Sequence, residues 1–236
     1  NGDDQGDGIY VLLKEVVDNS IDEFSMGFGK QIQITVTEKE AMVRDFGRGI
    51  PLNSVVKAVS VLNTGGKYDT NDGGNYEFSL GLNGLGLCST QYSSEYMDVE
   101  IKRDGYKYTL HFEHGENVGG LHSEPYTKKD TGTRIKWKPD LEVFTDINIP
   151  NEFFADVLKK QAVVNAGLKF VLKIETAPNK FEKSEFLYEH GISDYVAESD
   201  DLDVYKLYGM VYKDNQDLIK KMVVDSGYDK LYKEIK

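Results

Sequence analysis

Apolar residues recur at helical spacing in several parts of the chain. Over about 9–26 they are spaced three and four apart and form one broad face, which predicts an amphipathic helix. Shorter patterns of the same kind predict helices over 52–63 and 151–165. A short helix is also expected at about 84–91, where it follows a glycine-rich stretch.

Alternating apolar and polar positions predict strands between these helices. The run "QIQITVT" alternates with a period of two, and the run "AMVRD" can pair beside it. Two long strands are expected within 97–115, joined at Asp104-Gly105, because this pair of residues suits a tight turn. The first two runs lie at 31–37 and 41–45, and further strands are expected at 131–139 and 169–175.

The remaining stretches divide the chain into a compact part and a polar tail. Residues 64–86 hold seven glycines and little apolar periodicity, which predicts a long loop. The chain turns polar from about 177, and acidic and basic runs fill 198–236. We therefore expect one domain at 1–196, followed at 197–236 by a polar tail or the start of a further domain.

Composition favours a folded protein outside the membrane. Hydrophobic residues make up 39% of the 236 residues, and no apolar run approaches the roughly 18 residues of a membrane span. The single cysteine, Cys88, fits a reducing compartment, so we expect a cytoplasmic location without a membrane partner. A formal charge of −12 makes the chain a poor clamp for DNA by itself. An acidic domain can still bind a nucleotide through backbone N–H groups, a lysine and a metal ion.

Three polar residues of the first predicted helix share one strip. Glu15 and Asn19 are four residues apart and Asp22 is seven from Glu15, so all three lie opposite the apolar face. Such a strip is usually a solvated surface. A carboxylate beside a carboxamide can also activate a water and ligate a hard metal such as Mg²⁺. The helix alone leaves both interpretations open.

The glycine-rich region matches neither of two common phosphate-binding motifs. Lys67 in "TGGKYD" is followed by a tyrosine, where a P-loop has serine or threonine. The run "GLNGLG" at 81–86 reverses the glycine order of the Rossmann fingerprint and follows a loop, not a strand. Its glycines open the short predicted helix, where backbone N–H groups can receive phosphates. A loop without function is the alternative interpretation.

Four stretches together resemble one family. "EVVDNSIDE" at 15–23, "DFGRGIP" at 45–51, "TGGKYD" with "GLNGLG", and "TGT" at 131–133 occur in the order and spacing of the GHKL ATPases. The resemblance covers roughly 9–175, with a weaker echo at 186–196, and is closest to the B subunits of DNA gyrase and topoisomerase IV. It implies an α+β fold of the GHKL (Bergerat) type, a two-layer sandwich with a mixed, mostly antiparallel sheet and helices on one face.

The resemblance implies an ATP site around "DFGRGIP". Asp45 would accept a hydrogen bond from the adenine amino group, and Thr133 would reach the aspartate or a bridging water. Gly47 and Gly49 would let the base lie close to the backbone. The remaining residues implied here are Ile50 and Pro51, which would line the base pocket, and Arg48 and Arg103, which would lie at its mouth.

The resemblance also implies the catalytic groups. Glu15 would be the general base that polarises the attacking water, and Asn19 would contact the nucleotide and ligate Mg²⁺. Lys67 would hold the phosphates as the second catalytic residue, within a lid over 66–80. The motif that follows would contact the phosphates through Gly81, Leu82, Asn83, Gly84, Leu85 and Gly86.

The chain departs from the family pattern at two residues and in its extent. Phe46 stands where bacterial gyrases usually have a second polar residue, and Asn83 stands where they often have histidine. The family's amino-terminal arm and its transducer domain have no counterpart here, so we expect an isolated ATPase domain that is largely monomeric and turns over slowly. The full-length protein would be a homodimer that works with an A-type topoisomerase subunit and meets DNA only through that complex.

Two other functions stay open on the sequence. One is a GHKL chaperone or mismatch-repair module that clamps a protein partner, and the other is a nucleotide-binding domain without turnover. Glu15 weighs against the second of these, because binding alone needs no general base. The sequence does not separate gyrase from topoisomerase IV, because supercoiling depends on regions outside this chain.

Overall fold

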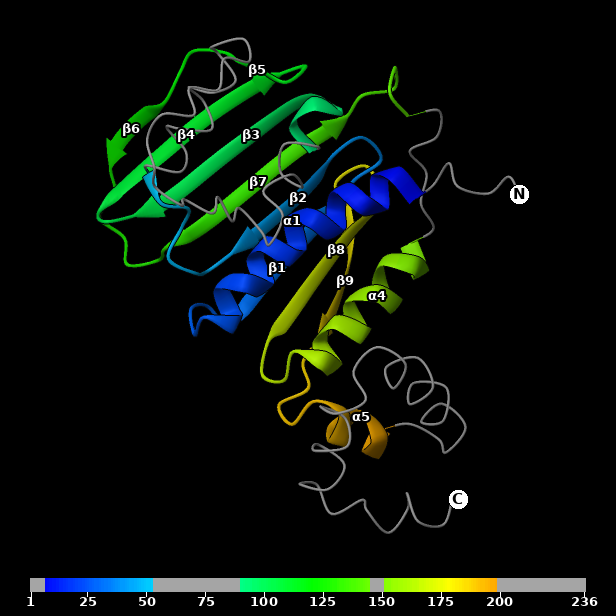
Figure 1. The fold of residues 1–236 in the computed structure, drawn as a ribbon. Helices are drawn as coiled ribbons and strands as arrows, with labels where there is room; N and C mark the ends of the chain where they lie inside the picture. Colours follow the sequence, from blue (N-terminus) through cyan, green and yellow to red (C-terminus); the bar gives the residue numbers. More distant parts are fainter. Residues whose placement is uncertain (1–6, 53–89, 145–150, 199–236) are drawn as a thin grey trace, which may run out of the picture.

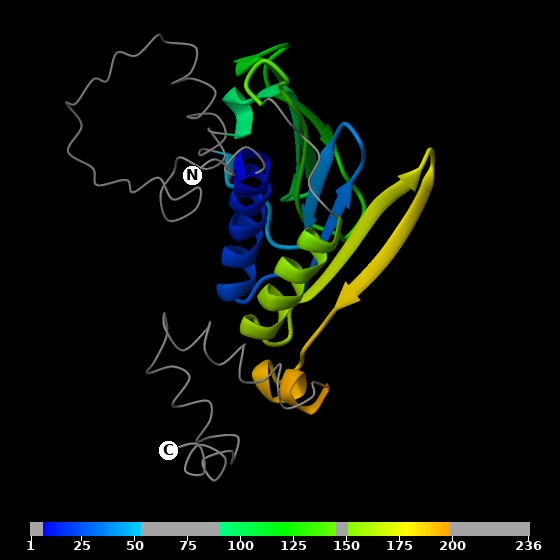
Figure 2. The same ribbon diagram turned by 90° about the vertical axis from the view of Figure 1, so that its right-hand side faces the viewer.

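The computed structural model of the chain describes residues 7–52, 90–144 and 151–198. Within them, strands build one mixed sheet, and two long helices lie together against one of its faces (Figures 1 and 2). The helices are α1 (Asp7–Ser25), α4 (Asn151–Val164) and the short α5 (Ile192–Glu198). The two-layer, mixed α+β fold expected from the sequence is confirmed.

The described part of the sheet has nine strands. Their spatial order is β5-β4-β3-β7-β2-β1-β8-β9, and β6 pairs with β4 beside this row. Their bounds are β1 Gln31–Val36, β2 Ala41–Asp45, β3 Ser94–Arg103, β4 Tyr106–Glu113, β5 Glu116–Asn117, β6 His122–Pro125, β7 Gly132–Pro139, β8 Lys169–Ala177 and β9 Lys180–Phe186.

Neighbouring described strands run antiparallel with a single exception. β1 and β8 are parallel, with Gln31 opposite Lys169 and Ile34 opposite Leu172. A parallel pair cannot be joined by a tight turn, and the chain between β1 and β8 contains α4, which covers the sheet beside them (Figure 2). A segment that comes late in the sequence, β8 with β9, therefore extends the sheet beyond β1.

The core lies between the two long helices and the sheet. Because side chains alternate along a strand, one row of every second residue crosses the sheet on the helix side. Ile34 on β1, Val43 on β2 and Ile135 on β7 belong to one such row, and each is at most 4% exposed. Buried residues of α1 and α4, among them Val16 and Leu158, pack against these rows.

The predicted elements agree with the described ones, apart from the short helix α5 and three strands that the sequence does not indicate. β5, β6 and β9 are edge segments whose side chains are mostly exposed or half-buried, so they carry no apolar alternation. The predicted helix at 52–63 lies outside the described residues beyond Leu52. The glycine-rich loop at 64–86 lies outside them entirely, and of the predicted helix at 84–91 they include only its last residues, which are helical.

The expected domain boundary between 196 and 197 falls inside α5. Residues 199–236, most of the expected tail, lie outside the described residues. Among the described helices, none is both long and apolar enough to cross a membrane.

Candidate functional site

Asp45 ends β2 and points into the apolar side of the sheet. It lies opposite Ile32 on β1, in a row that Thr133 of β7 and Ile101 of β3 continue. Asp45 is only 6% exposed, and so is Thr133. In the neighbouring row of the core the corresponding positions of β2 and β7 hold the aliphatic residues Val43 and Ile135. The polar pair therefore makes this end of the core a candidate binding site.

The two oxygens of the Asp45 carboxylate differ in their partners. Oδ1 accepts a hydrogen bond from the backbone N–H of Gly47 at 2.9 Å and another from the backbone N–H of Thr133 at 3.2 Å. Among the described residues, Oδ2 accepts none. Oδ2 is not among the fully buried polar atoms of the described residues that lack a partner, so it is accessible and can accept from an N–H group of a bound molecule.

Burial raises the pKa of Asp45 above its ordinary value, against the effect of the two backbone hydrogen bonds. The nearby carboxylate of Glu23 raises this pKa further, whereas the guanidinium of Arg44 lowers it. The carboxylate is therefore held in place by donors and at the same time destabilised by its surroundings. A donor that reached Oδ2 would stabilise the ionised form.

Two glycines after Asp45 allow close packing of the loop. A methyl group on Gly47 would lie 2.8 Å from Oε2 of Glu23, so α1 approaches the loop only because this side chain is missing. Gly49 has a φ of +81°, which favours glycine, and a methyl group there would lie 3.0 Å from the carbonyl oxygen of Lys102. The loop is thus held against α1 on one side and β3 on the other.

Arg48 is held on the outside of the loop by α1. Its backbone N–H donates to Glu23 Oε2 at 2.9 Å and its Nη2 donates to Glu23 Oε1 at 3.0 Å. Its guanidinium also lies 4.1 Å from the ring centroid of Phe28. On the other side of the loop, Arg103 donates from Nη1 to the carbonyl oxygen of Gly49 at 2.9 Å. Arg48, within the loop, and Arg103, beside it, are therefore held by different partners.

The "TGT" segment holds the loop from the β7 side. The Thr133 hydroxyl accepts a hydrogen bond from the N–H of Ile50 at 3.2 Å, so it is the backbone N–H of Thr133, not the hydroxyl, that reaches Asp45. The Thr131 hydroxyl donates to the carbonyl oxygen of Gly47 at 2.6 Å. At Gly132 a methyl group would lie 2.2 Å from the Asp45 carbonyl oxygen, so this position requires glycine.

The polar strip on α1 is present as expected. Glu15, Asn19 and Asp22 are all half-buried, and the pKa of Asp22 is raised, first by burial and then by Asp18 and Glu23. Pro51 is exposed at the end of the described loop. The other predicted phosphate-binding residues, Lys67 and Gly81 to Gly86, lie outside the described residues.

Glu23 is a site residue that the sequence interpretation missed. It contacts Arg48 by three hydrogen bonds and fills the space beside Gly47. Burial alone would raise the pKa of Glu23, but the hydrogen bonds from Arg48 outweigh it and lower the value. A signal was available, because Glu23 lies eight residues after Glu15 and so widens the polar strip of the helix.

The metal-binding side chains of the described residues fit a magnesium ion that shares its ligands with a bound nucleotide. In the described ranges there is no group of three or more histidine, cysteine, aspartate or glutamate residues that could hold a metal ion. Asn19 offers a hard carboxamide oxygen on the polar strip. Mg²⁺ is typically bound by one or two protein oxygens together with substrate phosphates and waters, so this donor set fits it.

A sequence comparison identifies the family that this geometry resembles. The family of histidine kinase-, DNA gyrase B- and HSP90-like ATPases matches residues 4–143. The B subunit of DNA topoisomerase 4 from Borreliella burgdorferi is 33% identical over 235 residues, which cover 98% of this chain and 36% of that protein. The B subunit of DNA gyrase from a Synechocystis strain is 34% identical over 199 residues, which cover 80% of this chain and 18% of that protein.

A solved structure supports the same grouping. The 43K ATPase domain of Thermus thermophilus gyrase B, in complex with an aminocoumarin, superposes with a TM-score of 0.64 at 25% sequence identity. The match covers 79% of this chain and 48% of that one. The chain thus spans about a third or less of these two curated relatives, and about half of the solved domain.

Proposed function

The chain belongs to the family of histidine kinase-, DNA gyrase B- and HSP90-like ATPases, and from this membership we propose that it binds and hydrolyses ATP as part of a type II DNA topoisomerase B subunit. The buried Asp45 carboxylate is the observation that carries the proposal. It has two backbone donors on Oδ1 and, among the described residues, no donor on Oδ2.

Asp45 would recognise the base. The 6-amino group of adenine is a donor that can reach Oδ2, whereas the oxygen at the same position of guanine would meet a carboxylate without a proton between them. The backbone N–H of Gly47 holds the carboxylate from one side and the backbone N–H of Thr133 from the other. The site would therefore select adenine over guanine by the direction of one hydrogen bond.

Hydrolysis would depend on the polar strip of α1. Glu15 is half-buried on this strip and would accept a proton from the attacking water. Asn19, one turn further along the helix, would hold Mg²⁺, which when bound neutralises phosphate charge. Lys67 and the backbone of 81–86 would contact the phosphates. Positioning and charge neutralisation supply most of the rate in such phosphoryl transfers, so few side chains need to react.

The relatives support a proposal for the whole protein, which extends beyond this chain. The two curated relatives named above are B subunits of topoisomerase 4 and of gyrase. We propose that the full protein acts as a homodimer with an A-type subunit in the cytoplasm, and that ATP-driven closure gates DNA strand passage. The described residues up to α5 would form the ATP-binding domain.

Calorimetric titration tests the proposal directly. The chain is titrated with a non-hydrolysable ATP analogue and Mg²⁺, and in parallel with the matching GTP analogue. We expect saturable binding of the adenine ligand and binding of the guanine ligand that is weaker by at least tenfold, since a charged hydrogen bond is worth about 1.5–3 kcal/mol. Equal binding of both ligands, or binding of neither, would refute the proposed recognition.

A further inference from the structure

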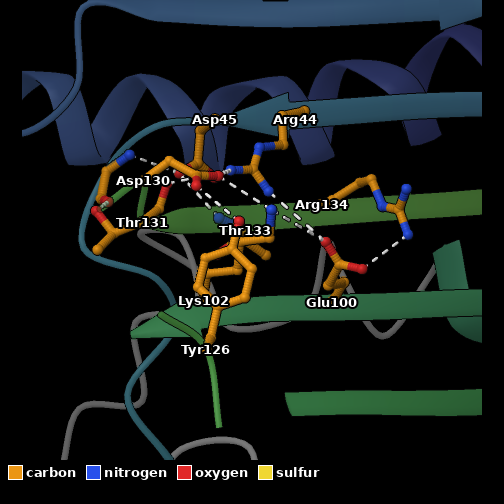
Figure 3. Close-up of polar contacts among 10 residues, drawn as sticks. Arg44, Asp45, Glu100, Lys102, Tyr126, Asp130, Thr131, Thr133 and Arg134 are labelled. Carbon is orange, nitrogen blue, oxygen red and sulfur yellow. Dashed lines mark hydrogen bonds and ion pairs between the residues drawn. The ribbon is translucent and has the colours of Figure 1, made fainter. Parts of the chain in front are cut away.

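A charged cluster lies on the open face of the sheet, directly behind Asp45 (Figure 3). Because side chains alternate along β2, Arg44 points to the face opposite the helices while its neighbour Asp45 points to the nucleotide side. Arg44 is nevertheless almost fully buried, with only 8% of its side chain exposed. A buried arginine needs carboxylate partners to offset the loss of hydration. The partners of Arg44 connect β2 to β3 and to the turn before β7.

Asp130 is the partner that joins three elements. Its Oδ2 accepts from Nη2 of Arg44 at 2.9 Å and from Nζ of Lys102, on β3, at 3.0 Å. Its Oδ1 accepts from the hydroxyl of Tyr126, which follows β6, at 2.6 Å. The hydrogen bond from Tyr126, followed by the one from Lys102 and by the charges of Lys102 and Arg44, lowers the pKa of Asp130 to about 2, so the carboxylate stays ionised at neutral pH.

Glu100 is the second anion of the cluster. Arg44 and Arg134 lie directly opposite each other on β2 and β7, where two like charges repel. Glu100 on β3 contacts both, with Oε2 at 2.9 Å from Nη2 of Arg134 and Oε1 at 3.8 Å from Nη1 of Arg44. Asp130 and Glu100 together therefore face three cations, and Asp130 contacts two of them, Arg44 and Lys102.

Thr131, which follows Asp130, begins the segment that is hydrogen-bonded to the loop at 45–51. Arg44 also donates from Nη2 to the carbonyl oxygen of Thr131 at 3.3 Å, and the Thr131 hydroxyl bonds to the Gly47 carbonyl. Two residues further on, the Thr133 N–H bonds to Asp45 Oδ1. The segment from Asp130 to Thr133 thus connects the charged cluster to the Asp45 carboxylate through a series of hydrogen bonds.

We propose that Asp130 is a positioning residue for nucleotide recognition, because it holds the turn before β7 where that turn fixes the Asp45 carboxylate. This inference rests on the proposed function, since it assigns the cluster to adenine selection. Without the Asp130 carboxylate, Arg44 and Lys102 would share only Glu100, at 3.8 and 3.9 Å, and Thr131 would be free to shift. The hydrogen bond from the Thr133 N–H to Asp45 Oδ1 would then weaken, and Oδ2 would be less well oriented toward the adenine amino group.

A comparison of two ligands separates this role from a merely structural one. The chain is titrated with the ATP analogue and with a matched purine nucleotide that lacks the 6-amino group. The ratio of the two dissociation constants reports the hydrogen bond to Asp45 alone. In the parent we expect a ratio of roughly 10 to 150. In Asp130→Ala we expect the ratio to fall by about three- to tenfold, the usual size of coupling within one network.

Three further variants sharpen the test. Asp130→Asn keeps an acceptor oxygen and should retain more of the ratio than Asp130→Ala. Tyr126→Phe removes one donor to Asp130 and should lower the ratio in the same direction, even if Asp130→Ala fails to fold. Asp98→Asn is the matched control, because it removes a carboxylate of similar exposure on the same face, paired with His111 and away from the loop.

The outcomes distinguish the two proposals. If the parent does not bind the ATP analogue, the proposed function is wrong and the role of Asp130 falls with it. If the parent binds with the expected ratio and Tyr126→Phe and a folded Asp130→Ala keep that ratio, only the positioning role is refuted. An equal loss of affinity for both ligands would likewise refute it, because it would indicate general damage to the fold.

Discussion

The side chain of Glu23 on α1 binds both the main chain and the side chain of Arg48. The carboxylate accepts from the Arg48 N–H at 2.9 Å and from Nη2 at 3.0 Å, and its own Cβ lies where a side chain at Gly47 would have to go. One residue thus fixes the loop in two ways, by filling space and by satisfying a backbone donor. The helix that carries the proposed general base is thereby tied to the loop that carries the proposed adenine acceptor.

Gly47→Ala should destabilise the fold by steric conflict with Glu23. The added methyl would lie within 3.0 Å of three Glu23 atoms, and overpacking of this kind costs about 1–3 kcal/mol. Glu23→Ala in the same background should recover part of the loss, because it removes two of those three atoms. Urea unfolding followed by fluorescence of Trp137, the single tryptophan and a fully buried one, measures both effects. Strictly additive losses would contradict the proposed contact.

Asp45→Asn should weaken ATP binding without disturbing the loop. The amide oxygen can still accept from the N–H groups of Gly47 and Thr133, but an NH₂ donor then faces the adenine amino group. Affinity for the ATP analogue should fall by about 10- to 150-fold or more. Calorimetry provides the measurement, with Asp98→Asn as the control. Unchanged affinity would show that Asp45 does not read the base.

The same substitution should stabilise the unliganded protein at neutral pH. The pKa of Asp45 is raised in the folded state, so its contribution to stability is greatest below its unfolded value of about 3.9 and is lost as pH rises through the folded value. The asparagine side chain carries no charge at any pH. The gain from Asp45→Asn should therefore appear above about pH 4, at about 1.4 kcal/mol for each pH unit between the two pKa values, and shrink below it. Thermal unfolding from about pH 3 to 8 tests this, and a gain that grows toward acid would have the wrong sign.

Glu15→Gln should separate chemistry from binding. Glu15 is proposed to contact the attacking water and not the nucleotide, so analogue affinity should stay within about twofold while phosphate release falls by about 10²-fold or more. Asp18→Asn, on the same helix, removes a carboxylate paired with Lys14 and should leave turnover unchanged. Glu15 loses its assigned role if the variant hydrolyses ATP at the parent rate.

Local pattern was enough to predict the centre of the fold and the strand that ends at Asp45, whereas the role of Asp45 came from the family resemblance. Alternation in "QIQITVT" and "TGTRIKWKP" predicts β1 and β7, because both strands bury every second residue. Contacts between distant residues could not be predicted in this way. Arg44 and Asp130 are separated by 86 positions, and nothing in either local sequence indicates the other. β9 was missed for a related reason, since an edge strand with both faces exposed leaves no apolar period.

The parallel pairing of β1 with β8 has a consequence for how the chain folds during synthesis. Ile32 and Ile34 leave the ribosome long before their partners Phe170 and Leu172, so the edge of β1 waits unpaired while all the intervening chain is made. Such non-local closure slows folding and exposes strand edges to aggregation. The matched family segment ends at residue 143, before β8 begins. A recombinant fragment cut there would carry Asp45 on a sheet whose β1 edge is unpaired, whereas one that includes β8 and β9 would cover that edge.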